Sequence, residues 1–210
     1  MTTGDARRLR ADAARNAQQI LRAARQSFAE VGPDVTLEEI ARRAGVGPRT
    51  LYRRFPSKED LVRAALDQTI DENISPAIEL ALADRDPLRG FTTVLEAAVA
   101  VVIREHHTLI AGNHSGALTV DVAAPFFESL AELTRRAQAA GQVRGDLVPE
   151  DLPRIIGMLV SVLWTMDPQS EGWRRYLRLV LDMLTSPAAS PLPPAVPMVS
   201  VLLRDDRSTQ

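Results

Sequence analysis

The side chains with the clearest chemical capability lie in one short stretch, PRTLYRRF, at residues 48–55. Arg49, Arg53 and Arg54 occur there together with Thr50 and Tyr52. A guanidinium carries a permanent positive charge and a planar fork of N–H donors, which matches phosphate oxygens and the acceptor edge of guanine. Hydroxyl groups add hydrogen bonds to phosphate oxygens. The stretch therefore indicates polyanion binding, and a short helix of this kind fits the major groove of double-stranded DNA.

The segment before this stretch carries the start and stop signals of a short helix. Thr36 and Glu39 form the Ser/Thr-x-x-Glu pattern of a capping box, which begins a helix. Gly45 ends it. We therefore predict a helix over about residues 36–44.

The stretch itself has matching signals at both ends. Pro48 suits the first turn of a helix, where a missing N–H costs nothing, and Phe55 followed by proline closes the helix. Ser57 with Asp60 three residues on predicts the cap of the next helix. Two short helices joined by a glycine-containing turn are helix-turn-helix geometry.

A helical wheel divides residues 48–55 into two faces. Pro48, Leu51 and Phe55 share one narrow arc, which we predict to face the core. The arginines and Thr50 fan across the opposite side, with Tyr52 on the rim. Any single arginine on a surface helix is more often solvated than ligand-bound. The interpretation of this stretch as DNA-binding therefore depends on the whole set of side chains together with the caps and the turn.

The segment TLEEIARRAGVGPRTLYRRFPSKEDL, residues 36–61, resembles the amino-terminal signature of TetR-type (tetracycline-repressor-like) transcriptional regulators. That pattern runs T-x-x-x-I-A-x-x-A-G-V-x-x-x-T-L-Y-x-x-F-x-x-K-x-x-L, and every fixed position is filled. The resemblance covers about the first 65 residues by motif. It implies a DNA-binding transcriptional regulator that binds a near-palindromic operator as a dimer, is released by a small-molecule effector and most often represses.

The resemblance also assigns roles to individual residues. The DNA-binding set that it implies is Thr36, Pro48, Arg49, Thr50, Tyr52, Arg53, Arg54 and Lys58. Within this set, Thr36, Tyr52 and Lys58 would contact phosphate oxygens. Arg49 and Thr50 would reach base edges, with Pro48 able to make apolar contact. Leu37 and Glu38 occupy positions where other members offer polar or basic groups to DNA. Glu38 suits the positive end of its own helix but repels phosphate, so we expect little base reading from this helix.

The arginines ahead of the first helix leave two alternatives open. Arg7, Arg8 and Arg10 precede a helix that periodicity predicts over about residues 11–31. They would either reach the DNA backbone or minor groove as a flexible arm or serve as a solubilising tail.

Charge is distributed unevenly along the 210 residues. The formal net charge is −2, but residues 1–63 carry a net +5 and the remainder a net −7. A basic amino-terminal third ahead of an acidic body is the pattern of a small polyanion-binding domain joined to a larger one. On charge alone, a chance distribution over solvated helix faces remains an alternative.

Composition excludes several classes. The chain has no cysteine, so it has neither disulfides nor thiolate chemistry, which fits a reducing cytoplasm. Nothing marks the first thirty residues as a signal peptide. The longest nearly charge-free apolar run, IIGMLVSVLWTM, has 12 residues, well short of the roughly 20 that cross a bilayer. We expect a cytoplasmic protein with no membrane partner.

The chain reads as all-α, with about nine helices and no strand. The helix from residue 57 is broken or kinked at Pro76, and further helices are predicted over 88–112, about 122–141, 152–167 and 173–185. We predict a helix-turn-helix DNA-binding domain at 1–60, a helical effector-binding and dimerisation domain at 61–186 and a proline-rich tail at 187–210. The tail should begin as extended polyproline-like chain, with Val199–Leu203 either packed on the body or disordered.

The last two helices carry broad apolar faces, which predict a homodimer through a four-helix bundle. The alternative is that these faces pack only within one chain. The predicted dimer interface comprises Ile155, Leu159, Leu163, Trp173, Tyr176, Leu177, Val180, Leu181 and Leu184.

The middle helices would enclose an effector pocket of unknown ligand. The predicted lining comprises Phe91, Leu95, Ile103, His107, Phe126, Phe127, Met158 and Trp164. For each of these residues, ordinary core packing is the competing interpretation.

Catalysis, cofactors and metals are not expected. The chain lacks a Gly-x-Ser-x-Gly elbow, a P-loop, a Gly-x-Gly-x-x-Gly loop and a His-Glu-x-x-His motif. His106 and His107 are adjacent, so they point in different directions on a helix, whereas zinc helices offer ligands at i and i+4. The alternative function is a helix-turn-helix protein without small-molecule input, controlled by abundance or a protein partner.

Overall fold

A computed structural model of the chain describes residues 3–117, 120–167, 170–185 and 190–196. Within these ranges every regular element is an α-helix. The ten helices are α1 Thr3–Val31, α2 Leu37–Arg43, α3 Pro48–Arg54, α4 Lys58–Asn73, α5 Ser75–Ala83, α6 Pro87–Arg104, α7 His106–Ser115, α8 Val120–Ala139, α9 Asp151–Leu163 and α10 Trp173–Thr185. The all-α prediction is confirmed.

The described residues form one helix more than the nine predicted, because the predicted helix over 88–112 is two helices. The break falls at Glu105, between α6 and α7. Its carboxylate accepts two hydrogen bonds from the guanidinium of Arg25 on α1, one of them 3.2 Å long, and one from the Thr108 hydroxyl at 3.2 Å. Pro76 lies in the first turn of α5, so the predicted break there is confirmed.

The chain forms two compact units, and neither is one continuous segment. The first comprises Met1–Thr69 and Glu105–Val122, and the second comprises Ile70–Arg104 and Ala123–Gln210. The predicted division at residues 60 and 186 concerns functional domains and stays a prediction.

In the first unit, α1 packs against α2 and α7. Ile20, Ala24 and Phe28 of α1 are at most 1% exposed, which matches the predicted apolar stripe. The helix begins at Thr3, not near residue 11, so the backbone of residues 7–10 is helical, and a flexible arm, one of the two alternatives for these arginines, is wrong.

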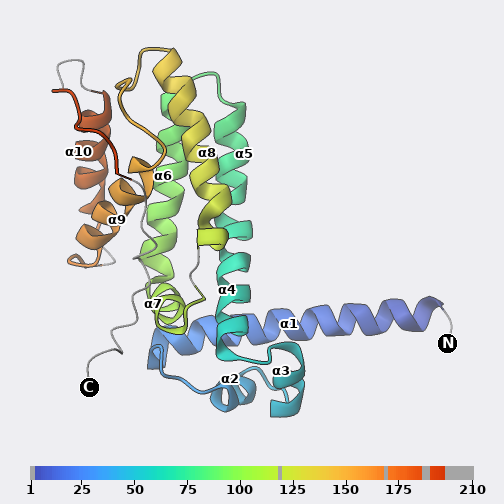
Figure 1. Cartoon of the computed structure of the whole chain (residues 1–210). Coiled ribbons are helices and arrows are strands. Elements are labelled where there is room, and N and C mark those ends of the chain that lie inside the picture. The colour runs from blue at the N-terminus through green and yellow to red at the C-terminus, as the bar shows by residue number, and fades with distance from the viewer. Residues whose placement is uncertain (1–2, 118–119, 168–169, 186–189, 197–210) are drawn as a thin grey trace. The chain divides into compact units, whose positions relative to one another are not determined.

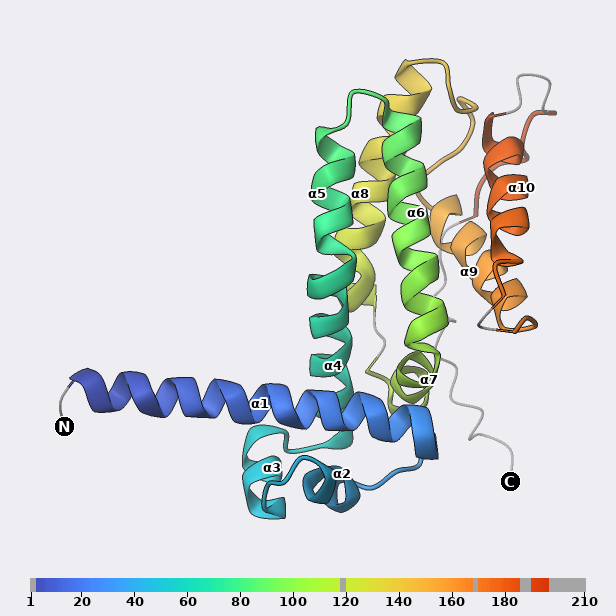
Figure 2. The ribbon, with the colours of Figure 1, turned by 180° about the vertical axis from the view of Figure 1, so that it is seen from behind.

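In the second unit, α5, α6 and α8 lie alongside one another, and α9 and α10 pair beside α6 (Figures 1 and 2). One apolar cluster joins these helices, with Val94, Leu95, Leu130 and Leu133 at most 1% exposed. The backbones of α5 and α6 approach so closely that a Cβ at Gly90 would lie 2.6 Å from the Ala81 carbonyl oxygen. The same cluster includes buried residues of α9 and α10, among them Leu159 and Leu177.

Residues 190–196 of the tail follow no regular secondary structure, in agreement with the predicted extended chain. Three side chains of the second unit hold the tail backbone. Arg144 donates to the Ser190 carbonyl at 2.6 Å, Asp146 accepts from the Leu192 N–H at 2.8 Å, and Arg154 donates to the Val196 carbonyl at 2.9 Å. Val199–Leu203 lie outside the described residues.

No helix in the described part of the chain combines the length and the apolar character that a bilayer crossing requires.

Candidate DNA interface

The turn between α2 and α3 forms because its backbone groups are satisfied locally. Gly45 adopts φ +68°, a left-handed conformation that other residues adopt only under strain. Its N–H donates to the Arg42 carbonyl at 3.2 Å, and the Val46 N–H donates to the Ala41 carbonyl at 3.0 Å, which is a Schellman closure of α2. The predicted end of this helix at Gly45 is confirmed.

The predicted caps are present, one of them in modified form. Thr36 Oγ1 accepts from the Glu39 N–H at 3.2 Å, but the Glu39 carboxylate binds arginines of α2 and makes no return bond. At the start of α4, the Asp60 N–H donates to Ser57 Oγ at 3.0 Å and the Ser57 N–H donates to Asp60 Oδ2 at 3.1 Å. That capping box is complete.

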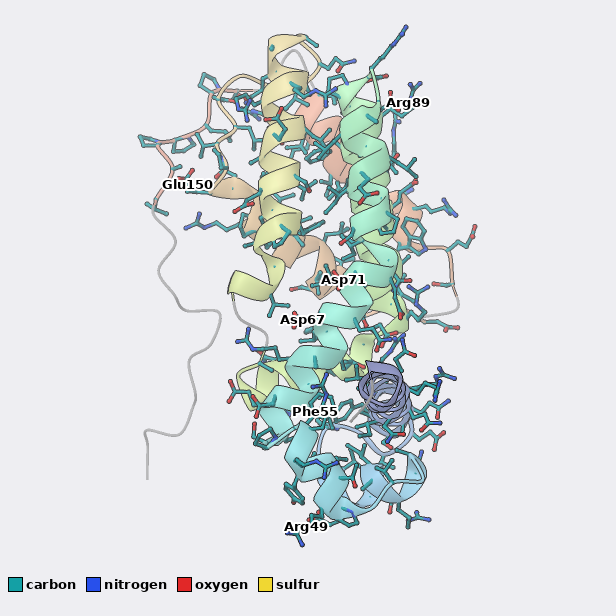
Figure 3. All side chains as sticks on the ribbon, turned by 90° about the vertical axis from the view of Figure 1, so that its right-hand side faces the viewer. Arg49, Phe55, Asp67, Asp71, Arg89 and Glu150 are labelled. Atoms are coloured by element: carbon teal, nitrogen blue, oxygen red, sulfur yellow. The ribbon has the colours of Figure 1, made fainter. Side chains whose placement is uncertain are left out.

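Helix α3 is attached to the first unit by part of the predicted arc. Leu51 and Phe55 are buried at 0% and 6% exposure. Pro48 is exposed, so the prediction that it faces the core is wrong. It is the first residue of α3, and burial of this face of the helix begins only at Leu51. Arg49 points away from the ribbon into solvent (Figure 3).

The arginines of α2 and α3 differ in their partners. On α2, Arg42 pairs with Glu39 at 2.5 Å, and Arg43 pairs with Glu30 at 2.5 Å and with Glu39 at 3.5 Å. On α3, Arg49 and Arg53 are exposed and have no carboxylate partner among the described residues. Arg54 is likewise exposed, with its guanidinium 5.9 Å from the ring of Phe55.

Thr36, Thr50 and Tyr52 complete the polar side of this surface. Thr36 and Tyr52 are exposed, and Thr50 is half-buried. The Tyr52 hydroxyl donates to Glu38 Oε1 on α2 at 2.6 Å. This bond lowers the pKa of Glu38 and raises the pKa of Tyr52, because it stabilises the carboxylate and the protonated phenol. No local pattern in the sequence indicates this contact between two helices.

Lys58 has a partner within its own unit. Its ammonium donates to the backbone carbonyl of Pro33, in the connection between α1 and α2. The side chain is half-buried, so it helps to hold the start of α4 against that connection.

Comparison with known proteins decides the family. The profile described as "Bacterial regulatory proteins, tetR family" matches residues 20–65, which span the helix-turn-helix. An uncharacterised HTH-type transcriptional regulator of Mycobacterium tuberculosis is 31% identical over 144 residues, which is 63% of this chain and 72% of that protein. The chain belongs to the TetR family. It is a DNA-binding transcriptional regulator, and this is a family of regulators, not of enzymes.

A solved TetR-family structure agrees with this assignment. The TetR transcription regulatory protein from Mycobacterium vanbaalenii is 31% identical, with a TM-score of 0.57 over 84% of this chain and 99% of that chain. FadR from Bacillus subtilis, solved in complex with stearoyl-CoA, has a TM-score of 0.67 over 80% of this chain and 97% of that chain. Its identity of 19% makes it a likeness of fold alone.

The dimer face predicted for this TetR-family chain needs correction. Ile155, Leu159, Leu163, Leu177 and Leu184 are buried at 2–8% exposure inside their own chain. The rest of the predicted set packs partly buried against the same cluster: Trp173, Tyr176, Val180 and Leu181.

Other apolar residues of the same two helices are the exposed ones. Met158 on α9 and Trp164 at its C-cap are 57% and 52% exposed, and Leu179 and Met183 on α10 are 54% and 46% exposed. Sequence reasoning missed Leu179 and Met183. Their spacing of four residues was a signal, but it did not show which apolar face the chain covers itself.

The predicted effector-pocket residues do not come together as one set. Phe91, Leu95, Ile103, Phe126 and Phe127 belong to the apolar cluster of the second unit. Met158 on α9 and Trp164 at its C-cap are exposed, so their assignment to an enclosed pocket is wrong.

A third residue predicted to line the effector pocket, His107, lies in the first unit. His107 belongs to that unit and is exposed, so its assignment to an enclosed pocket is wrong as well. Its ring lies edge to face with the ring of His106, with 5.2 Å between the ring centroids. The pKa of His106 is lowered mainly by burial and to a smaller extent by repulsion from His107. Among the residues with assigned positions, no three His, Asp or Glu side chains are placed to share a metal ion.

Proposed function

We propose that this TetR-family regulator is a repressor that binds a near-palindromic operator as a homodimer, reads it with α3 and is released by a small-molecule effector. The observation that carries the proposal is the difference between the two helices of the helix-turn-helix. The arginines of α2 are paired with carboxylates, whereas Arg49 and Arg53 of α3 lie exposed without such partners in the described structure. Cations without carboxylate partners bind phosphates or base edges without first breaking an ion pair.

Within α3, the proposed roles follow from position. Arg49 and Thr50 lie in the first turn, where recognition helices contact base edges, with Pro48 available for apolar contact. Arg53, Arg54 and Tyr52 follow on the remaining exposed turns, and Thr36 caps α2. Lys58 would contact phosphate in addition to holding the Pro33 carbonyl.

The exposed apolar residues of α9 and α10 support the homodimer. Met158, Trp164, Leu179 and Met183 are each about half exposed in the single chain. A second copy would cover them in a two-fold arrangement, which places two α3 helices on successive major grooves and requires a near-palindromic site.

The apolar cluster of the second unit supports an effector of apolar character. Phe91, Leu95, Ile103, Phe126 and Phe127 gather there on α6 and α8. The FadR structure that shares this fold is a complex with stearoyl-CoA. We propose that residues 61–186 take up the effector and form the dimer, that residues 1–60 bind the operator, and that residues 187–210 are an appended tail.

Selection of genomic DNA fragments by the purified protein tests this proposal. We expect enrichment of one near-palindromic sequence with half-sites about one helical turn apart or somewhat more. Thermal melting against a compound library then tests effector control, because a ligand at 100 times its dissociation constant adds about 2.7 kcal/mol to stability. A compound that raises the melting temperature and releases the selected DNA supports an effector. A DNA site without such a compound supports a regulator controlled by abundance or a protein partner.

A further inference from the structure

A carboxylate lies on the proposed DNA-binding surface itself. Glu38 is in the first turn of α2, is exposed, and accepts the Tyr52 hydroxyl of α3 at 2.6 Å. Tyr52 is 42% exposed, so the phenol and the carboxylate reach the surface side by side. An approaching DNA phosphate that contacts Tyr52 must therefore also approach Glu38.

The charge of Glu38 is not offset by a nearby cation. Glu30 and Glu39 are both paired with arginines, at distances of 2.5 Å. Glu38 has no salt bridge among the residues that the structure describes, and its partner Tyr52 is a neutral phenol. The carboxylate thus lies without a salt bridge at a surface whose proposed ligand is a polyanion.

The single hydroxyl proton of Tyr52 creates a second cost. A phenol has one O–H to donate. While this proton is donated to Glu38, it is not available to a phosphate oxygen. DNA binding through Tyr52 must therefore break the Glu38 bond and also overcome repulsion between the carboxylate and the phosphate.

We propose that Glu38 is a positioning residue that restrains phosphate binding by Tyr52, so that the regulator binds all DNA less tightly than its cationic surface alone would allow. The inference rests on the proposed role of Tyr52 as a phosphate contact. A glutamate can also accept a hydrogen bond from the amino group of cytosine. The bond to a phosphate-contacting phenol favours a position at the DNA backbone, and the experiment below separates the two roles.

The test compares variants at both ends of the bond. Glu38→Gln keeps an oxygen that accepts from Tyr52 but removes the charge, Glu38→Ala removes both, and Tyr52→Phe removes the proton. Glu79→Gln, at an exposed carboxylate in the other compact unit, is the control for net charge. The probe is a fluorescent mixed-sequence duplex of about 30 base pairs, which exceeds two half-sites one helical turn apart, titrated at several salt concentrations.

We expect Glu38→Gln to tighten binding about three- to tenfold, because the proposed dimer loses two exposed repulsive charges, one beside each half-site, and to steepen the salt dependence by up to about two ions. Glu38→Ala should tighten binding further, because it also frees the Tyr52 proton. In a Tyr52→Phe background the two substitutions at Glu38 should become equal. Glu79→Gln should bind like the parent chain, and melting temperatures check that each variant is folded.

Three results would overturn the inference. If Tyr52→Phe weakens binding but Glu38→Gln does not tighten it, the restraint by Glu38 is wrong while the phosphate role of Tyr52 stands. If Tyr52→Phe has no effect, the proposed role of Tyr52 fails together with the inference. If Glu38→Gln weakens binding and loses preference at one base pair of the selected operator, Glu38 reads a base.

Discussion

Replacing Leu179 and Met183 by glutamate should separate the proposed dimer into monomers. The two side chains lie one helical turn apart on α10 and are 54% and 46% exposed in the single chain. Full burial of a leucine or methionine contributes about 1.5 to 3 kcal/mol, so about 1 kcal/mol remains to be gained at each position. Four such side chains would meet in the proposed symmetric dimer, which gives about 4 kcal/mol, or roughly a thousandfold in the dissociation constant.

The double variant should lose more free energy of association than this apolar contribution, because each new carboxylate would also have to be desolvated on entering the interface. Sedimentation over a range of protein concentrations measures the dissociation constant. The matched control is Leu80→Glu on α5, where the leucine is 71% exposed and lies outside α9 and α10. If the double variant dimerises as tightly as the control, the two helices do not form the interface.

Three further predictions concern the scaffold. Gly90→Ala should lower the unfolding free energy by about 1 to 3 kcal/mol in a urea titration, because the added carbon would lie 2.6 Å from an α5 carbonyl oxygen; an unchanged midpoint would contradict the close approach. Glu105→Gln should lower it by about 2 to 3 kcal/mol, less than for a fully buried pair because Arg25 is 24% exposed, and an unchanged midpoint would show that the pair contributes nothing. The Arg89 guanidinium lowers the pKa of Asp84 from 3.8 to about 2, so this pair stabilises the fold above about pH 4, and the stabilisation is lost as the pH falls toward 2. Arg89→Ala should therefore make the melting temperature less dependent on pH between about 4 and 2. An equal pH dependence in both proteins would contradict this contribution.

The local parts of the DNA-binding unit could be predicted from the sequence. The cap at Thr36, the stop at Gly45 and the capping box at Ser57 each involve groups within a few residues, so their types and spacing are sufficient. The amphipathic stripe of α1 was predictable for the same reason. Its first turns were not, because their sequence carried no clear start signal.

Contacts between distant segments were not predictable from spacing. The break at Glu105 accompanies an ion pair with Arg25, 80 residues away in the chain. The bond between Tyr52 and Glu38 likewise joins two helices whose separate patterns give no sign of it.

The interface residues show a different limit. Periodicity indicated that α9 and α10 are broadly apolar, but Leu159 and Met158 look alike to such a pattern. The structure buries Leu159 at 3% exposure and leaves Met158 at 57%. Only packing against α6 and the rest of the cluster decides which face the chain covers itself.

The most direct test of the central claim compares Arg49→Ala with Arg42→Ala on the selected operator and on its single-base variants. Both arginines are exposed and both substitutions remove one positive charge from the same unit, but Arg42 is paired with Glu39 whereas Arg49 has no such partner in the described structure. Arg49→Ala should cost about 1 to 3 kcal/mol and relax the preference at particular base pairs, while Arg42→Ala should leave the preference unchanged. Equal effects of the two substitutions, or an unchanged preference in Arg49→Ala, would contradict DNA reading by α3.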